Sequence, residues 1–346
     1  MDLKYKMGTS VFSKNKKELV SPISTNRLCF SRDKAGWNNV RITFESLVCA
    51  ARLTNRMLVL PPASYIDHLA DAPFHELHVY DSASLASVIS FEAGQSTQLA
   101  PNFSGSLNDF IRTDHAGKLG PVVTLSPQAT RIQHFECLSL STQEKRLASE
   151  TVLAMRFADA YEDEVDEILR KSSLTTYHGV HLRRGDFARF RPETQWSGAD
   201  LQGRVRSTFP WDERGWPLVV ACFVTDTEHD PYPELAVALH ERCVLRTDEL
   251  YSNLSLTSIG FHNNTLTNVS SQLKSAVLDT ILMIKANRFA GTPESTFSTG
   301  VWHWRARDRI LRKERPEAPV GLGSMQQPSS GKCWQRCTDF AAITCL

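Results

Sequence analysis

The chain has 346 residues, of which 41% are hydrophobic and 22% charged, and its formal net charge at pH 7 is +1. This is the composition of an ordinary globular protein, and at about 150 residues per domain the length predicts two domains. The near-neutral charge excludes a general electrostatic attraction for nucleic acid or an anionic membrane, so any anionic ligand must be bound by local groups. The eight cysteines include no CxxC pair, which argues against a zinc ribbon or a thioredoxin-like site.

The two ends of the chain carry few folding signals. Residues 1–25 are basic and lack the apolar run of a signal peptide, so we expect a flexible arm there. No stretch approaches the roughly 20 apolar residues of a membrane-spanning helix. Residues 316–346 are predicted to be a linker followed by a cysteine-containing tail, whose Cys333, Cys337 and Cys345 can pair only in an oxidising compartment.

Glycosylation sequons bear on the location of the protein. They occur at Asn102, Asn253, Asn263 and Asn268. Such sites suit a protein of the ER or Golgi lumen. Because no signal or transmembrane segment is visible, a cytoplasmic protein or a truncated chain stays open.

The first half of the chain begins with a strand–helix–strand pattern. Residues 27–30 read as a strand, and a helix of roughly 14 residues follows, with Asn38 or Asn39 as its expected cap. Its apolar stripe consists of Val40, Phe44, Leu47, Val48 and Ala51. Residues 57–60 read as a buried strand, which predicts a parallel sheet with a binding crevice at the carboxyl ends of its strands.

A weakly patterned stretch separates this unit from the second half. No elements are assigned between residues 63 and 143, and a long surface helix is expected from about 142 to 171. That helix closes a predicted first domain over residues 26–172.

The second half alternates strands and helices again. Strands are expected at 177–182, 218–225, 243–245 and 289–290. Helices are expected at 234–242, around the apolar face of Leu273, Val277, Ile281 and Ile284, and from the segment after 298 to about 311. We therefore predict a second α/β domain over residues 173–315.

The chemistry is concentrated at the end of the first strand of this second domain. The segment Gly179-Val-His-Leu-Arg-Arg-Gly-Asp-Phe187 places Arg183 and Arg184 directly after the strand that ends at His181-Leu182. Two guanidinium groups at the carboxyl edge of a sheet suit an anion, and a diphosphate is the expected ligand. The alternative is that one arginine pairs with Asp186 and the other is solvated.

Two glycine-containing turns complete the pattern. Gly291-Thr-Pro-Glu-Ser-Thr-Phe-Ser298 leads into a helix, where hydroxyl and backbone N–H groups would form an anion-binding nest. Ala35-Gly-Trp-Asn-Asn-Val-Arg41 is a similar turn in the first half. Alone, the first segment is only a well-capped helix, and the second is too degenerate to be identified as a phosphate loop.

Together, these segments resemble the GDP-fucose protein O-fucosyltransferase family. A GGxN-type turn, an LVLPP-like strand, HxRR-x-DF and a late D…STFS block recur there in this order. The matching segments here are Gly36–Arg41, Asn55–Pro62, His181–Phe187 and Asp279–Ser298. The resemblance spans roughly residues 27–312.

The resemblance implies an α/β GT-B fold, with two Rossmann-like domains facing across a cleft. It implies inverting transfer of fucose from GDP-fucose to a hydroxyl of a protein or glycan acceptor, without a metal or other cofactor. Arg183 would stabilise the leaving group. The other residues that the motifs carry over as substrate-binding are Gly36, Asn38, His181, Arg184, Asp279, Ser295, Thr296 and Phe297.

The sequence departs from some members of that family at the catalytic base. Ala35 stands where they carry a glutamate, so no base is assigned, although Asp33, Glu45 and Asp186 are carboxylates close in sequence to the motifs. Two alternatives stay open. One is transfer of another deoxysugar such as rhamnose, and the other is a catalytically silent protein that binds a nucleotide or glycan.

Overall fold

The computed structural model describes most of the two predicted domains. The described residues are 25–32, 35–66, 69–94, 100–130, 138–183, 192–209, 215–223, 237, 243–253, 271–292 and 295–311, without the side chains of 69–71, 222–223, 252–253 and 310–311. Several predictions fall outside these residues. They are the N-terminal arm, Arg184, most of the helix expected at 234–242, the sequons at Asn263 and Asn268, and the cysteine tail.

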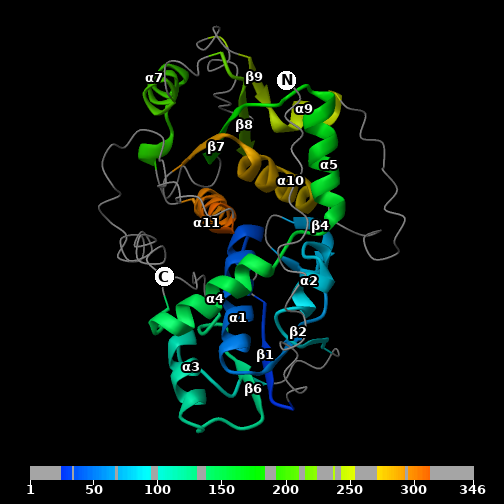
Figure 1. Cartoon of the computed structure of the whole chain (residues 1–346), viewed down its shortest axis with the longest axis vertical. Helices are drawn as coiled ribbons and strands as arrows, with labels where there is room; N and C mark the ends of the chain where they lie inside the picture. Colours follow the sequence, from blue (N-terminus) through cyan, green and yellow to red (C-terminus); the bar gives the residue numbers. More distant parts are fainter. Residues whose placement is uncertain are drawn as a thin grey trace.

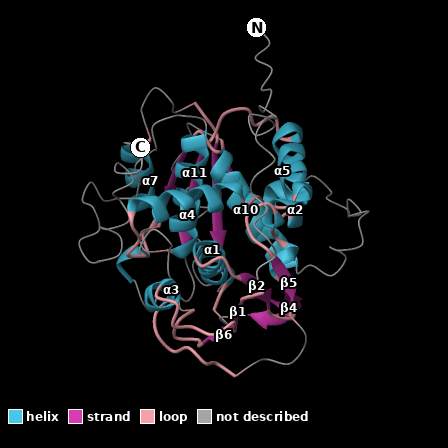
Figure 2. Cartoon of the chain, turned by 60° about the horizontal axis from the view of Figure 1, so that its bottom comes forward, coloured by secondary structure: helices cyan, strands magenta, loops and turns pink. Residues whose placement is uncertain are grey.

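The first half of the chain builds a four-stranded parallel sheet in the order β5-β2-β1-β6, whose strands are all labelled in Figure 2. Its strands are β1 (Arg27–Phe30), β2 (Met57–Leu60), β5 (Phe91–Ala93) and β6 (Val122–Leu125). In β1, Leu28 and Phe30 are buried, and Arg27 aligns with Met57 on one side and Val122 on the other. The strand–helix–strand prediction is confirmed.

Helix α1 (Trp37–Leu53) connects β1 to β2 and is almost entirely buried. The predicted cap is wrong: Gly36 is the N-cap residue, no side chain caps the helix, and Asn38 and Asn39 lie within its first turn. An asparagine side chain can cap a helix only from the position before its first helical residue. The two asparagine side chains are therefore available for other contacts.

Short elements fill the stretch to which the sequence assigned nothing. They are the antiparallel hairpin β3 (Ser64–Ile66) and β4 (Leu69–Phe74), the 3-10 turn η1 (Glu76–His78), and the helices α2 (Ser82–Ala86) and α3 (Leu107–His115). Arg32 joins this region to the end of β1. It donates to Glu76 and Ser64 and to the carbonyl of Pro62.

The long helix predicted from about 142 to 171 is two helices, α4 (Thr142–Ala154) and α5 (Asp159–Lys171). Between them, Met155 adopts an extended backbone, and Phe157 forms a bridge with Tyr80. Phe157 is 2% exposed and stacks on Tyr80. Helical periodicity continues through the break, but burial of Phe157 against a distant residue outweighs it.

The second half builds another four-stranded parallel sheet, in the order β10-β7-β8-β9. Its strands are β7 (His178–Arg183), β8 (Leu218–Phe223), β9 (Val244–Arg246) and β10 (Arg288–Gly291). Its helical elements are η3 (Pro192–Thr194), α7 (Gly198–Thr208), α9 (Thr247–Asn253), α10 (Ser271–Lys285) and α11 (Thr296–Leu311). At Gly179 in β7, a Cβ atom would lie 2.8 Å from the Met283 sulfur, so only glycine lets α10 approach this closely.

The two sheets lie at opposite ends of the molecule, and α1 and α11 lie together at its middle (Figure 1, Figure 2). Buried apolar side chains of both halves form one continuous core. Helix α5 packs on α10, where Lys274 pairs with Glu164 and Lys285 with Glu162. The limits 26–172 and 173–315 stay a prediction.

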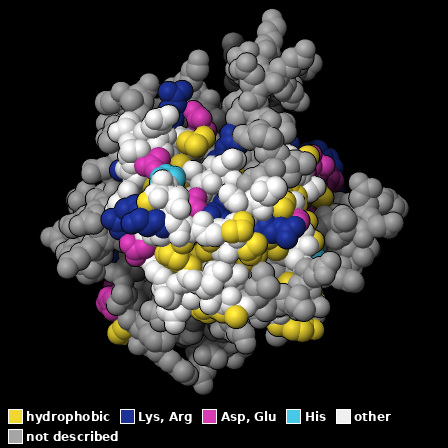
Figure 3. Space-filling view, turned by 90° about the horizontal axis from the view of Figure 1, so that it is seen from below, with side chains coloured by type: hydrophobic (Ala, Val, Ile, Leu, Met, Phe, Trp, Pro, Cys, Tyr) yellow, Lys and Arg dark blue, Asp and Glu magenta, His cyan; other side chains and the backbone are white. Residues whose placement is uncertain are grey.

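The lower end of the molecule carries charges of both signs. Figure 3 shows side chains of both charges scattered among apolar ones over the described part of the lower end. Among the described residues, no helix combines the length and the apolar character needed to cross a bilayer.

Candidate functional site

The centre of the site is His181, in β7 of the second sheet. Its Nδ1 atom lies 2.8 Å from Ser298 Oγ, and its ring stacks on Phe297 with 4.3 Å between the ring centroids. Burial, together with the positive charge of Arg183, lowers the pKa of His181 to about 3. The imidazole is therefore neutral near pH 7, and its position is fixed by a hydrogen bond and a ring contact.

A glycine allows the first turn of α11 to sit on this strand end. Gly291 of β10 aligns with His181, and a Cβ atom at this position would lie 2.3 Å from Ser298 Oγ. No side chain fits there without moving Ser298. The sequence Gly291-Thr-Pro-Glu-Ser-Thr-Phe-Ser298 thus brings Phe297 and Ser298 onto His181 because it opens with glycine.

Arg183 is held at the last position of β7. Its backbone N–H donates to Thr292 Oγ1 at 2.9 Å, and that hydroxyl donates to the His181 carbonyl at 3.1 Å. Thr292 is a site residue that the sequence analysis did not identify. The sequence could have indicated Thr292, because it is a hydroxyl residue that directly follows the glycine at the end of a predicted strand.

The N-terminus of α11 supplies further polar groups. Ser295 precedes the helix and is 3% exposed, and Thr296 is its half-buried first residue. The first N–H groups of a helix lack intrahelical acceptors, and the helix dipole is positive at this end. The structure therefore brings Ser295, Thr296, Phe297, His181 and Arg183 together at a place suited to an anion.

Asp279 lies farther out along the same sheet edge. It is a half-buried residue of α10 and accepts a hydrogen bond from the hydroxyl of Tyr251, in the helix that follows β9. Burial raises the pKa of Asp279 to about 6, although hydrogen bonds from Tyr251 and Thr247 act in the opposite direction. Its contacts are with α9, whereas the His181 group is built on β7 and α11.

The first half contributes Gly36 and Asn38 at the start of α1. Among the described residues, the buried Oδ1 atoms of Asn38 and Asn39 and the Nε1 atom of Trp37 have no hydrogen-bond partner. Each buried polar atom left unpaired costs about 1–3 kcal/mol. A ligand that pairs with the Asn38 amide would remove this cost.

Glu45 is excluded as the catalytic base. It is 3% exposed and accepts hydrogen bonds from Arg41, Arg307 and Trp304. Burial alone would raise the pKa of Glu45, but the guanidinium groups of Arg307 and Arg41 hold it below its ordinary value. Asp33 and Asp186 lie outside the described residues.

Among the described residues, no group of three or more His, Cys, Asp or Glu side chains is placed to hold a metal ion. Among the described residues, Arg183 and the N-terminus of α11 are positive groups close to His181.

The fold of the chain has known counterparts among solved structures. No protein-family model and no curated protein sequence matches the chain. The crystal structure of POFUT1 in complex with GDP-fucose matches with a TM-score of 0.57 and 13% identity over 87% of this chain and 98% of that one. The apo form of POFUT1 matches with a TM-score of 0.56 and 13% identity, over 88% of this chain and 100% of that one. The chain therefore has the fold of POFUT1, and the GT-B fold implied by the resemblance to the O-fucosyltransferase family is confirmed.

Proposed function

We propose that this protein transfers fucose from GDP-fucose, with inversion, to a hydroxyl of a protein or glycan acceptor. The observation that carries the proposal is the neutral His181 fixed between Ser298 and Phe297, next to Arg183 and the N-terminus of α11. The fold supports it, because POFUT1 was crystallised with GDP-fucose.

In this reaction the bond between the anomeric carbon of fucose and the β-phosphate oxygen breaks, and its electrons leave with GDP. The Arg183 guanidinium and the N–H groups at the start of α11 would stabilise the negative charge that develops on the β-phosphate. We propose that this arrangement needs no metal ion, so activity should be unchanged by EDTA.

The acceptor oxygen attacks the opposite face of the sugar and gives its proton to a base. His181 is a poor candidate, because a pKa of about 3 makes its imidazole too weak a base to take the proton efficiently at neutral pH. We propose that it orients the strand end. The other two carboxylates close to the motifs, Asp33 and Asp186, are the candidates for the base.

The remaining carried-over residues would bind the nucleotide and reach the sugar. Phe297 offers a ring next to His181, and Ser295 and Thr296 offer hydroxyl groups at the helix N-terminus. In its ionised form, Asp279 would accept hydrogen bonds from the guanine N–H groups. Arg184 would add a second guanidinium, and Gly36 and Asn38 would approach from the first half.

The test is calorimetric binding of GDP, UDP and ADP, followed by release of GDP from GDP-fucose with and without candidate acceptors. We expect selective binding of GDP and turnover of GDP-fucose. Arg183→Ala should lower kcat/KM for GDP-fucose by about a hundredfold or more, because it removes the guanidinium from the leaving group. Arg112→Ala, which alters an exposed arginine of α3, is the matched control and should be fully active.

Other outcomes separate the alternatives. If the protein turned over GDP-rhamnose in preference to GDP-fucose, the proposed donor sugar would be wrong, but the proposed type of reaction would stand. Selective GDP binding without turnover would indicate a silent binding protein. Absence of a guanine preference, or an active Arg183→Ala variant, would contradict the proposal.

We also propose that the protein resides in the ER or Golgi lumen, supported by its sequons and its tail cysteines. Mass spectrometry of the native protein should then find N-glycans and a disulfide in the tail. Free thiols without glycans would contradict this location.

A further inference from the structure

A buried charged group joins the two halves of the molecule where α1 meets α11. The carboxylate of Glu45 accepts from Arg41 Nη1 of α1 at 2.9 Å, and from Arg307 Nη1 and Trp304 Nε1 of α11 at 2.8 and 2.9 Å. Arg41, Glu45 and Arg307 are all less than 5% exposed. Glu45, in the first half of the chain, thus accepts hydrogen bonds from two side chains of the second half.

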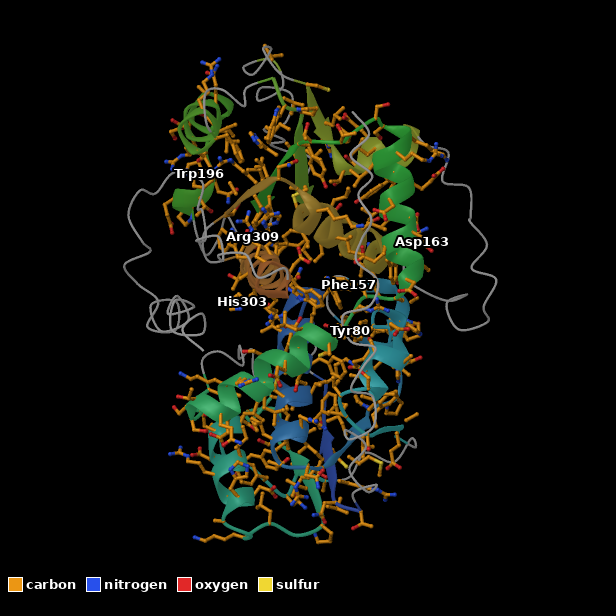
Figure 4. The ribbon with its side chains drawn as sticks, viewed as in Figure 1. Tyr80, Phe157, Asp163, Trp196, His303 and Arg309 are labelled. Carbon is orange, nitrogen blue, oxygen red and sulfur yellow. The ribbon has the colours of Figure 1, made fainter. Side chains whose placement is uncertain are left out.

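An aromatic stack runs beside this charged group. Phe44 contacts Tyr80, Tyr80 stacks on Phe157, and Phe157 stacks on Trp304, with centroid distances of 5.4, 6.0 and 4.8 Å. Figure 4 labels Tyr80 and Phe157 close to the place where α1 and α11 meet. The stack links α1 to α11 through the break between α4 and α5.

A close approach of the two helices completes the junction. The Arg41 guanidinium lies against Gly300 of α11, where a Cβ atom would be only 1.6 Å from Nη2. Among the described residues, Nε and Nη2 of Arg41 have no hydrogen-bond partner. Glu45 is therefore the carboxylate on which the placement of Arg41 depends.

The junction lies one helical turn from both parts of the candidate site. Arg41 comes three residues after Asn38 in α1, and Gly300 comes three residues after Phe297 in α11. The angle at which the two helices cross thus determines how the Asn38 end of one faces the Phe297 end of the other.

We propose that Glu45 is a positioning residue that holds the two halves at the angle required for transfer. The proposal rests on the proposed function, because it assumes that Asn38 and the nucleotide act together. The physical reason is charge. Without the carboxylate, the buried Arg41 cation would have no hydrogen-bond acceptor among the described residues and would lie close to a second buried cation, Arg307, so the helices would separate to hydrate it. The His181–Ser298 contact lies within the second half and does not involve Glu45.

The test compares Glu45→Gln with Glu164→Gln. Both acids are 3% exposed, but Glu164 pairs with Lys274 between α5 and α10, away from the junction. For Glu45→Gln we expect a Kd for GDP within about twofold of wild type and a kcat for GDP-fucose lowered about tenfold or more. Glu164→Gln should keep both values within about twofold.

Backbone hydrogen exchange provides a readout beyond activity. Glu45→Gln should speed exchange in the facing parts of α1 and α11 and leave β7 unchanged, whereas Glu164→Gln should affect only α5 and α10. If Glu45→Gln does not fold, Trp304→Phe removes a single donor while keeping a ring in the stack. It should lower kcat without changing the Kd for GDP.

The outcomes distinguish this inference from the proposed function. If Glu45→Gln and Trp304→Phe keep both GDP affinity and kcat, the positioning role is wrong and the function stands. If either loses GDP binding in proportion to kcat, Glu45 acts on the nucleotide site and the inference is also wrong. If wild-type protein binds no GDP, the proposed function itself fails.

Discussion

Replacing Gly300 by alanine tests the packing at the α1–α11 junction most directly. Gly300 lies inside α11, where alanine favours a helix by about 1 kcal/mol relative to glycine. An added Cβ atom would lie 1.6 Å from Arg41 Nη2 and 2.8 Å from Arg41 Cζ. Real Cβ contacts are longer than about 3 Å, so the guanidinium must move.

The expected size of the effect follows from three contributions. Forcing extra atoms into a packed place costs about 1–3 kcal/mol, and loss of the charge-assisted bond from Arg41 to Glu45 costs about 1.5–3 kcal/mol. The helix preference of alanine offsets about 1 kcal/mol. We therefore expect Gly300→Ala to lower the free energy of unfolding by about 1.5–5 kcal/mol.

Denaturant unfolding measures this change, and Gly203→Ala is its control. Gly203 lies in helix α7 and has no heavy atom within 4 Å of an added Cβ, so alanine there should raise stability by up to about 1 kcal/mol. The reasoning would be refuted if Gly300→Ala were as stable as wild type while Gly203→Ala behaved as expected.

Three further predictions concern titration and modification. Because the pKa of Asp279 is raised from 3.8 to about 6, its contribution to stability is present below pH 3.8 and lost as the pH rises through about 6. GDP binding should change in the opposite sense, weakening below pH 6 more steeply in wild type than in Asp279→Asn, and equal slopes would contradict this. The ring protons of His181, assigned with His181→Gln, should keep constant NMR shifts from pH 8 to 5, and a titration midpoint in that range would be inconsistent with a pKa of about 3. Asn102 should be free of glycan even in a lumenal protein, because its amide nitrogen donates to the Val122 carbonyl and its oxygen accepts from Thr124 N–H. A glycan found on the Asn102 peptide by mass spectrometry would contradict this.

Local patterns predicted the four strands of the second sheet and two strands of the first, β1 and β2, but not β5 and β6. Strand β7 and helices α1, α10 and α11 carry apolar residues at regular spacing, and that spacing is a property of a few neighbouring residues. The same reasoning failed where a distant partner decided the structure. The helical pattern continues through Phe157, but its contact with Tyr80 breaks the helix there.

Some residues of the candidate site could be predicted from the sequence, and others could be found only in the structure. The motifs indicated His181, Arg183 and the segment from Ser295 to Phe297, and the structure places these residues together. Thr292 was missed although it lies inside a motif, because its role depends on two backbone groups of β7. Glu45 was weighed as a base, but only the structure shows that it is buried between two arginines.

By itself, the sequence determined the first strand–helix–strand unit, the strands of the second sheet and the motif that contains Arg183, because these depend on side-chain period and on short-range spacing. The tertiary structure decided how the halves meet. Glu45 and Arg307 are 262 residues apart, and their pairing leaves no periodic trace in either helix. A buried ion pair of this kind forms when folding removes water from both partners. It depends on the charge and shape of side chains that are distant in the sequence, and local propensity does not predict it.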